Sequence, residues 1–212
     1  MMVRKIAVNV ARLVIAMTFI LSGFVKAVDP LGTQYKIVDY LKAMQLGTFV
    51  PDFLTLTASV LLSAVEFGLG ICMLFAIRRR LVSLLALCMM IPMTALTLWL
   101  AVANPVTDCG CFGDAVTLTN WQTFTKNVVL LGCVAIVRYR PLDMMRFVSK
   151  TNQWIVTNYS MLFIFAVSAW SLYDLPQFDF RPYHVGTNIL KGMEIPEGAE
   201  MPTFETTYLM EK

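Results

Sequence analysis

Residues 81–103 read LVSLLALCMMIPMTALTLWLAVA, a run of 23 residues without a charged side chain. A membrane-spanning helix needs about 20 predominantly apolar residues, because the hydrocarbon core of a bilayer is about 30 Å thick and a helix rises about 1.5 Å per residue. The run therefore predicts a transmembrane helix. Residues 54–77 form a second such run, which only Glu66 interrupts. Together they predict an integral membrane protein.

Three further stretches have the length and hydropathy of spans. Residues 6–28 contain Arg12 and also Lys26, which is near enough to the end of the stretch for its ammonium group to reach the lipid headgroups. The prediction of a span in residues 121–139 is weakened by two polar side chains near the start of the stretch. Residues 155–173 contain only uncharged polar interruptions. The sequence thus predicts an all-α membrane protein with five transmembrane helices.

The first stretch has a second reading. Residues 13–25, preceded by basic side chains, have the apolar character of a signal peptide, but no Ala-x-Ala cleavage site follows them. We therefore predict that the first helix is retained.

The composition excludes several classes of function. Of the 212 residues, 58% are hydrophobic and only 15% are charged, whereas charged residues make up about a quarter of a typical soluble domain. The net charge of +3 is small, and the basic residues occur in short runs, which argues against nucleic-acid binding. The single histidine, His184, argues against a conventional zinc site or a bis-histidine haem, so we expect no bound metal.

The basic residues predict the orientation, because the cytoplasmic loops of membrane proteins carry an excess of lysine and arginine. Arg4 and Lys5 precede the first predicted span. Two further groups lie between spans two and three and between spans four and five: Arg78, Arg79, Arg80, Arg138, Arg140, Arg146 and Lys150. We therefore expect a cytoplasmic N-terminus, with residues 29–52, 104–120 and 174–212 on the extracytoplasmic side.

A short amphipathic helix is predicted between the first two spans. In residues 35–44, one helical face carries Ile37, Val38, Leu41 and Met44. Such a helix lies either on the outer membrane surface or against the ends of the bundle, and the spacing alone does not separate these alternatives.

The C-terminal segment, residues 174–212, is polar and rich in proline. Residues 204–210 alternate like the start of a strand, and an isolated strand of this length is not stable in water. We expect the segment either to continue in a longer chain or to pair with a partner subunit.

Residues 108–114, DCGCFGD, are the stretch best suited to chemistry. Cys109 and Cys111 are near the distance limit for a disulfide, and Gly110 permits the tight bend that a small ring requires. A strained and exposed disulfide suits the oxidation of other thiols, and disulfides persist outside the cytosol. The alternatives are a static disulfide, a bridge to a partner protein, and a metal site to which two thiolates contribute half of the ligands.

The other three cysteines, Cys72, Cys88 and Cys133, lie inside apolar stretches. Their positions along the predicted helices place them in the cytoplasmic half of the membrane, too far from Cys109 and Cys111 for direct exchange. We expect them to be small apolar core residues.

Glu66 is predicted near the membrane midplane, where an ionised carboxylate is costly. It should be protonated, paired or facing a polar cavity, and it is a candidate functional residue. Arg12 enters from the cytoplasmic side and reaches a depth within one side-chain length of Glu66. We therefore expect an ion pair between Arg12 and Glu66, with a structural role rather than one in proton transfer.

Several motifs resemble those of the DoxX-like membrane proteins. They are Ser22-Gly23-Phe24-Val25-Lys26 followed by Asp29-Pro30, and Val65-Glu66-Phe67-Gly68-Leu69-Gly70. The cysteine motif, Asp108 to Gly113, is similar to that of the MauE (methylamine utilisation) branch. The resemblance implies a four-helix bundle in residues 1–140, to which this chain adds a cytoplasmic loop and fifth helix in residues 141–173 and an extracytoplasmic segment in residues 174–212.

The same resemblance implies a protein of the bacterial inner membrane that helps to form disulfides in the small subunit of methylamine dehydrogenase. Cys109 and Cys111 would be the thiol pair. The positions with a structural or family role are Arg12, Lys26, Glu66, Gly110 and Gly113.

Two hypotheses about function follow. In the first, the protein is a thiol–disulfide redox or disulfide-formation factor that passes oxidising equivalents to an extracytoplasmic thiol-containing client, with a quinone as the candidate electron acceptor. In the second, it is a non-catalytic membrane anchor or assembly subunit that binds a partner through residues 204–210. A transporter is disfavoured, because no repeated pair of broken helices is evident.

Overall fold

The computed structural model describes residues 2–45, 50–104 and 118–174. The chain divides into two compact units, Met1–Phe180 and Arg181–Lys212, and every described residue belongs to the first. The described residues form α-helices and one 3₁₀ turn, with no strand among them. The predicted strand in residues 204–210 and the cysteine motif lie outside the described ranges.

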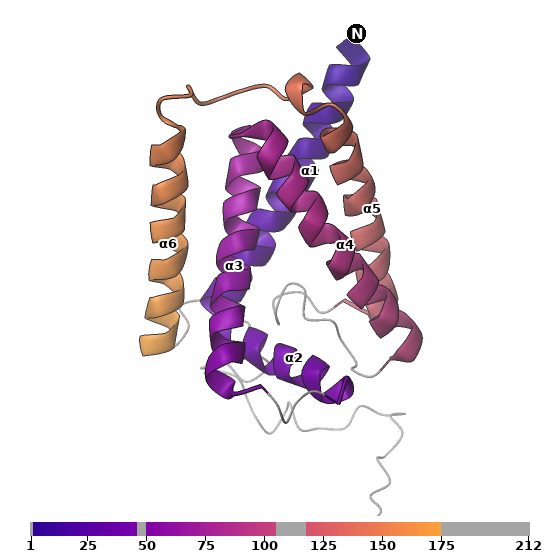
Figure 1. Cartoon of the computed structure of the whole chain (residues 1–212), viewed down its shortest axis with the longest axis vertical. Coiled ribbons are helices and arrows are strands. Elements are labelled where there is room, and N and C mark those ends of the chain that lie inside the picture. The colour runs from indigo at the N-terminus through magenta and orange to yellow at the C-terminus, as the bar shows by residue number, and fades with distance from the viewer. Residues whose placement is uncertain (1, 46–49, 105–117, 175–212) are drawn as a thin grey trace, which may run out of the picture. The chain divides into compact units, whose positions relative to one another are not determined.

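Long helices make up the bundle (Figure 1). They are α1 (Met2–Val28), α3 (Asp52–Leu74), α4 (Arg79–Ala103), α5 (Asn120–Tyr139) and α6 (Gln153–Tyr173). Helix α1 packs mainly against α3 and α5, α4 packs against α5, and α6 packs against α3. The short helix α2 (Pro30–Ala43) crosses one end of the bundle, and the connector with the 3₁₀ turn η1 (Pro141–Asp143) crosses the end where the N-terminus lies.

Four of these helices, α1, α3, α4 and α6, are long and apolar enough to cross a membrane. The prediction of an all-α, multi-pass membrane protein is confirmed at this level. The predicted span in residues 121–139 forms a helix, α5, of 20 residues, but α5 is not among the four. The five-span topology therefore stays a prediction.

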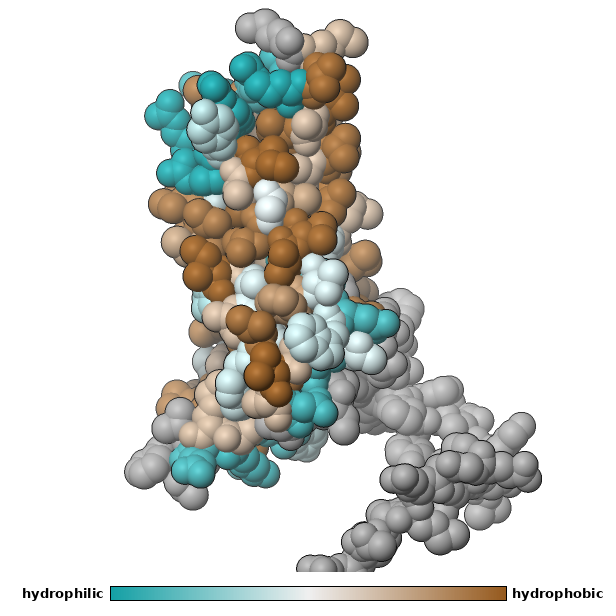
Figure 2. All heavy atoms as spheres, turned by 90° about the vertical axis from the view of Figure 1, so that its right-hand side faces the viewer, coloured by the Kyte–Doolittle hydropathy of each residue, from teal (hydrophilic) through white to brown (hydrophobic). Residues whose placement is uncertain are grey.

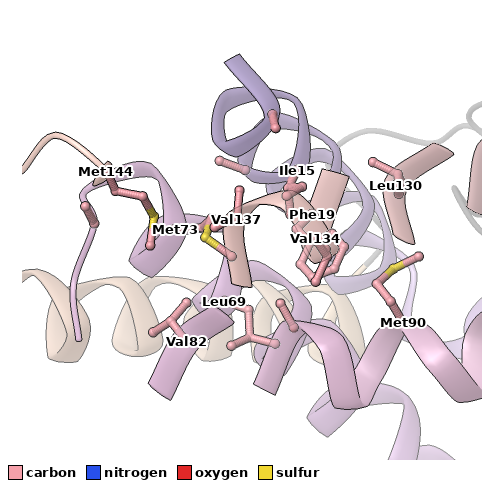
Figure 3. Close-up of a cluster of buried hydrophobic side chains, with 14 of the residues drawn as sticks. Ile15, Phe19, Leu69, Met73, Val82, Met90, Leu130, Val134, Val137 and Met144 are labelled. Carbon is pink, nitrogen blue, oxygen red and sulfur yellow. The ribbon is translucent and has the colours of Figure 1, made fainter. Parts of the chain in front are cut away.

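A buried apolar core lies between α1, α3, α4 and α5. Figure 3 labels ten of its side chains, Ile15, Phe19, Leu69, Met73, Val82, Met90, Leu130, Val134, Val137 and Met144. The outer faces of the helices are apolar as well, and Figure 2 shows a broad hydrophobic band between hydrophilic side chains near the two ends of the bundle. Lipid tails can cover such a band, whereas a soluble protein rarely exposes one of this extent.

Helix α2 starts five residues earlier than the predicted amphipathic segment. The Asp29 side chain accepts a hydrogen bond of 2.9 Å from the Gly32 amide, and Pro30 takes the first helical position, where its fixed φ suits the helix. The sequence prediction missed this start signal, because it followed only the apolar spacing of residues 35–44.

Polar contacts hold α2 against the start of α3. The Ser59 hydroxyl donates a hydrogen bond of 2.7 Å to the Pro30 carbonyl, and the Gln34 amide donates one of 3.1 Å to the Thr55 hydroxyl. Pro30, Thr33 and Gln34 are buried. Of the two alternatives that the sequence left open, these contacts support a helix that covers the end of the bundle.

Candidate functional site

A buried ion pair joins α1 to α3. The Lys26 ammonium lies 2.6 Å from Glu66 Oε1 and 2.7 Å from Glu66 Oε2, and it also donates to the Ser22 hydroxyl at 3.1 Å. The Ser22 hydroxyl in turn donates to Glu66 Oε2 at 2.7 Å. The side chains of the pair are only 7% and 8% exposed. The three N–H groups of Lys26 therefore all have acceptors, which is the condition under which an ion pair survives burial.

The expected pairing of Glu66 with Arg12 is wrong. The Arg12 side chain instead donates a hydrogen bond of 2.5 Å to the carbonyl of Met145, and its guanidinium lies 5.1 Å from the centre of the Phe147 ring. The expectation that Lys26 reaches the lipid headgroups is also wrong, because the residue is buried on the face of α1 that packs against α3. The sequence thus indicated an ion pair between the correct helices but selected the wrong cation.

Glycines let α1 and α3 approach closely beside the ion pair. A Cβ atom at Gly23 would lie 2.5 Å from the Phe67 amide nitrogen, and one at Gly70 would lie 2.8 Å from the amide nitrogen of Ile20. Both clashes are with backbone atoms, which cannot move aside as a flexible side chain can. The glycines of the two motifs therefore set the helix separation that allows Lys26 to reach Glu66.

The ion pair borders a small cavity of about 40 Å³ with a mostly apolar lining. Its other walls are formed by methionines of α4 and by two polar side chains of α5, Lys126 and Asn127. The Asn127 amide donates a hydrogen bond of 3.1 Å to the Thr97 hydroxyl of α4. This volume is enough for a water molecule or a few, but not for an organic substrate. The arrangement supports a structural role for the pair.

Side chains of α1 and α4 hold the connector after α5 at the opposite end of the bundle. Arg4 forms an ion pair of 2.9 Å with Asp143, and Arg79 donates hydrogen bonds of 2.7 and 2.8 Å to the carbonyls of Leu142 and Met144. Asn9 accepts a hydrogen bond of 3.0 Å from the Met145 amide. Sequence reasoning did not predict these contacts of Asn9 and Arg79, because their partners are backbone groups that no side-chain pattern marks.

The cysteine motif itself, including Gly110 and Gly113, lies outside the described residues. Both ends of the segment that carries it are described. Helix α4 ends at Ala103 and is followed by its C-cap residue Asn104, which has a φ of 44°. Helix α5 begins with a capping box in which Thr119 and Gln122 bond each other's backbone. The Asn120 amide donates a hydrogen bond of 2.8 Å to the side-chain oxygen of Asn104. The two ends of the segment therefore meet at the end of the bundle away from η1.

The remaining cysteines, Cys72, Cys88 and Cys133, are free thiols. Cys72 and Cys133 are partly buried and pack against the apolar core. Cys88 is exposed on α4, so its interpretation as a core residue is wrong. Among the residues that the structure describes, no cluster of three or more histidine, cysteine or acidic side chains is positioned to hold a metal ion.

A comparison of the sequence with models of protein families shows which family the chain belongs to. The model described as methylamine utilisation protein MauE matches residues 4–140, which is more than half of the chain. The chain belongs to the MauE family. The match spans α1 to α5 and includes residues Ser22–Lys26 and Val65–Gly70, whereas α6 and the C-terminal segment lie beyond it.

MauE membership and the four apolar helices together make this a multi-pass membrane protein. The wider likeness to DoxX proteins stays a prediction from the motifs. No curated protein and no solved structure matches the chain.

Proposed function

We propose that the protein is a thiol–disulfide redox or disulfide-formation factor of the bacterial inner membrane, with Cys109 and Cys111 as its reactive pair. The family description favours a role in methylamine utilisation. The client in that process would be an extracytoplasmic protein that needs disulfides.

The observation that carries the proposal is the hydrogen bond between Asn104 and Asn120. It joins the two ends of the segment that contains both cysteines, and this junction lies at the end of the bundle opposite the connector. Cys109 follows Asn104 by only five residues in the sequence, and on this ground we propose that the thiol pair lies near that end. Four arginines gather at the other end, which supports an extracytoplasmic position for the thiols: Arg78, Arg79, Arg80 and Arg146.

The proposed reaction moves two electrons and two protons. A client thiolate attacks one sulfur of the Cys109–Cys111 disulfide, which forms a mixed disulfide and releases the other cysteine as a thiol. The second client thiol then displaces the bound cysteine, so the client gains a disulfide and the pair becomes a dithiol. A quinone is the proposed acceptor that returns the pair to the disulfide and becomes a quinol.

We also propose that α5 is a fifth span and that the N-terminus is cytoplasmic. Two polar residues, Lys126 and Asn127, lower the hydropathy of α5. Both line the cavity beside the Lys26–Glu66 pair; Asn127 is buried and Lys126 is partly buried. The outward face of α5 carries Val128, Val129 and Ile136. Its 20 residues would extend about 30 Å, which matches the hydrocarbon core.

The redox proposal is tested with the purified protein in lipid nanodiscs, a reduced dithiol peptide and a soluble quinone. Replacing Cys109 or Cys111 with serine should lower peptide oxidation at least about 100-fold, since a disulfide needs both sulfurs. The Cys72→Ser/Cys133→Ser variant is the matched control and should keep the parent rate. An unchanged rate in either of the first two variants would rule out the proposed pair.

The non-catalytic alternative is separated by the same variants. If the protein acts only as an anchor or assembly subunit, replacing both outer cysteines would leave client disulfides and complex formation unchanged. Truncation of residues 204–210 would then remove the complex.

A further inference from the structure

A groove of about 570 Å³ runs between α3, α4 and α6 at the connector end of the bundle. It is separate from the Lys26–Glu66 cavity and from the ends of the cysteine segment. The part of the groove farther from the connector is apolar and is formed by side chains such as Val65, Leu69, Leu85 and Met161. Because Val65 and Leu85 are also exposed on the outer surface of their helices, the groove is continuous with the face that lipid covers.

The mouth of the groove is cationic. Arg78, at the start of α4, and Lys150, just before α6, both line it, and none of its described lining residues is acidic. Within residues 2–45, 50–104 and 118–174, neither side chain has an ion-pair partner. Two cations without a counter-ion at the edge of an apolar groove are complementary to a ligand with an anionic head and an apolar tail.

Polar and aromatic side chains complete the mouth. Gln153, Thr157 and Asn158 of α6 line the groove beside Lys150, and Trp154 is exposed there. Tryptophan is enriched where a membrane helix meets the headgroup region. Along α6 the lining of the groove thus changes from polar side chains to the apolar Met161 within about two helical turns. A lipid leaflet changes in the same way, from polar headgroups to apolar acyl chains.

The backbone at the mouth is strained. Ala76 and Arg78 have φ values of 54° and 38°, in the left-handed region that side chains with a Cβ rarely adopt. These residues form the tight turn between α3 and α4, and this turn brings Arg78 to the groove. Local strain of this kind persists where the surrounding structure imposes it and often accompanies a binding site.

We propose that the groove binds one anionic phospholipid from the leaflet at the connector end. The headgroup phosphate lies between Arg78 and Lys150, and one acyl chain follows the apolar part of the groove between α3, α4 and α6. Basic pockets between transmembrane helices bind anionic headgroups in this way. A neutral quinone or a zwitterionic lipid would leave the net positive charge of the mouth uncompensated. The bound lipid would fill the space between α6 and the rest of the bundle.

The test is native mass spectrometry of the full chain released from nanodiscs that contain phosphatidylglycerol and phosphatidylcholine in equal amounts. The wild type should retain one phosphatidylglycerol after the other lipids have dissociated. The Arg78→Gln/Lys150→Gln variant should bind it about 30-fold more weakly, because each basic residue near an anionic headgroup contributes about a fivefold factor. The matched control, Lys5→Gln/Arg138→Gln, removes the same charge from residues that do not line the groove and should bind as the wild type does.

A second variant locates the lipid without changing any charge. Leu85→Trp fills the groove from α4 and should lower retention of phosphatidylglycerol, whereas Val129→Trp, at an exposed site on α5, should not. Equal retention of the two lipids, equal effects of the two charge variants, or displacement of phosphatidylglycerol by inorganic phosphate would each overturn the proposal. None of these outcomes bears on the cysteine pair, so the two proposals fail independently.

Discussion

Arg12 and Lys26 are two buried cations of the same helix, and their side chains have different kinds of partner. Arg12 is 1% exposed and bonds a backbone carbonyl of the connector at one end of the bundle. Lys26 is 6% exposed and binds the carboxylate of Glu66 towards the other end. The comparison shows that a charged residue in an apolar span does not by itself indicate the type of partner it has.

The difference also separates two kinds of stabilisation. Around Lys26, side chains bond side chains and two glycines set the helix distance, so the arrangement depends on residue identity at several positions. Around Arg12, side chains of α1 and α4 bond the backbone of residues 142–145, so the connector sequence itself is less constrained. Substitutions at the two sites should therefore differ in size and in what they disturb.

The largest loss of stability is expected from the substitution Glu66→Gln. It leaves the Lys26 ammonium buried without a counter-charge, and breaking a buried pair in this way costs about 3–5 kcal/mol. Unfolding in mixed micelles with increasing dodecyl sulfate, followed by circular dichroism, measures the loss. The double variant Lys26→Met/Glu66→Met should lose less than either single change, because no uncompensated charge remains.

The control for this prediction is the partly exposed Arg4–Asp143 ion pair at the connector end of the bundle. Arg4→Gln removes the Arg4–Asp143 ion pair, in which the Arg4 side chain is 46% exposed, and should cost less than about 1 kcal/mol. Equal losses for Glu66→Gln and Arg4→Gln would show that the Lys26–Glu66 pair has no special structural role.

A smaller and more local effect is expected from Arg12→Met. The change leaves the Met145 carbonyl without its donor, at a cost of about 1–3 kcal/mol. Amide hydrogen exchange of residues 143–147 should become faster while that of α3 stays the same, because the lost bond ties the connector and not the core helices. Leu13→Met introduces the same side chain at the neighbouring exposed position and is the control. Faster exchange in α3 but not in the connector would contradict this assignment.

Much of the fold was predictable from the sequence. Apolar runs revealed all the long helices, because lipid requires about 20 such residues per span whatever the partner helix is. Lys26 and Glu66 were also singled out, since charged groups stand out in apolar stretches, whereas Ser22 was named only as part of the family motif. Two polar residues near the start of α5, Lys126 and Asn127, line the cavity beside the Lys26–Glu66 pair, and only the packed structure reveals which face of α5 lies towards the bundle.

The partner of Glu66 could not be predicted from depth alone. The prediction from depth assumed that the end of α1 and the start of α3 lie at the same depth in the membrane. In the structure, α2 lies against the first turns of α3, and the Pro30 carbonyl just after α1 accepts a hydrogen bond from Ser59, well inside α3. This offset moves Glu66 towards the end of α1 that carries Lys26 and away from Arg12. The connector contacts and the groove at Arg78 depend on tertiary placement of loops, for which the sequence contains no periodic signal.

The most direct test of the central claim is a redox titration of Cys109 and Cys111 in the full-length protein. The protein in nanodiscs is equilibrated with glutathione buffers of graded potential and trapped with an impermeant maleimide, and the peptide that carries both cysteines is quantified by mass spectrometry. The account predicts a single two-electron transition from two labelled thiols to none, at about −120 to −200 mV, as for oxidants of extracytoplasmic thiols. Identical labelling of the peptide across the whole range would contradict it.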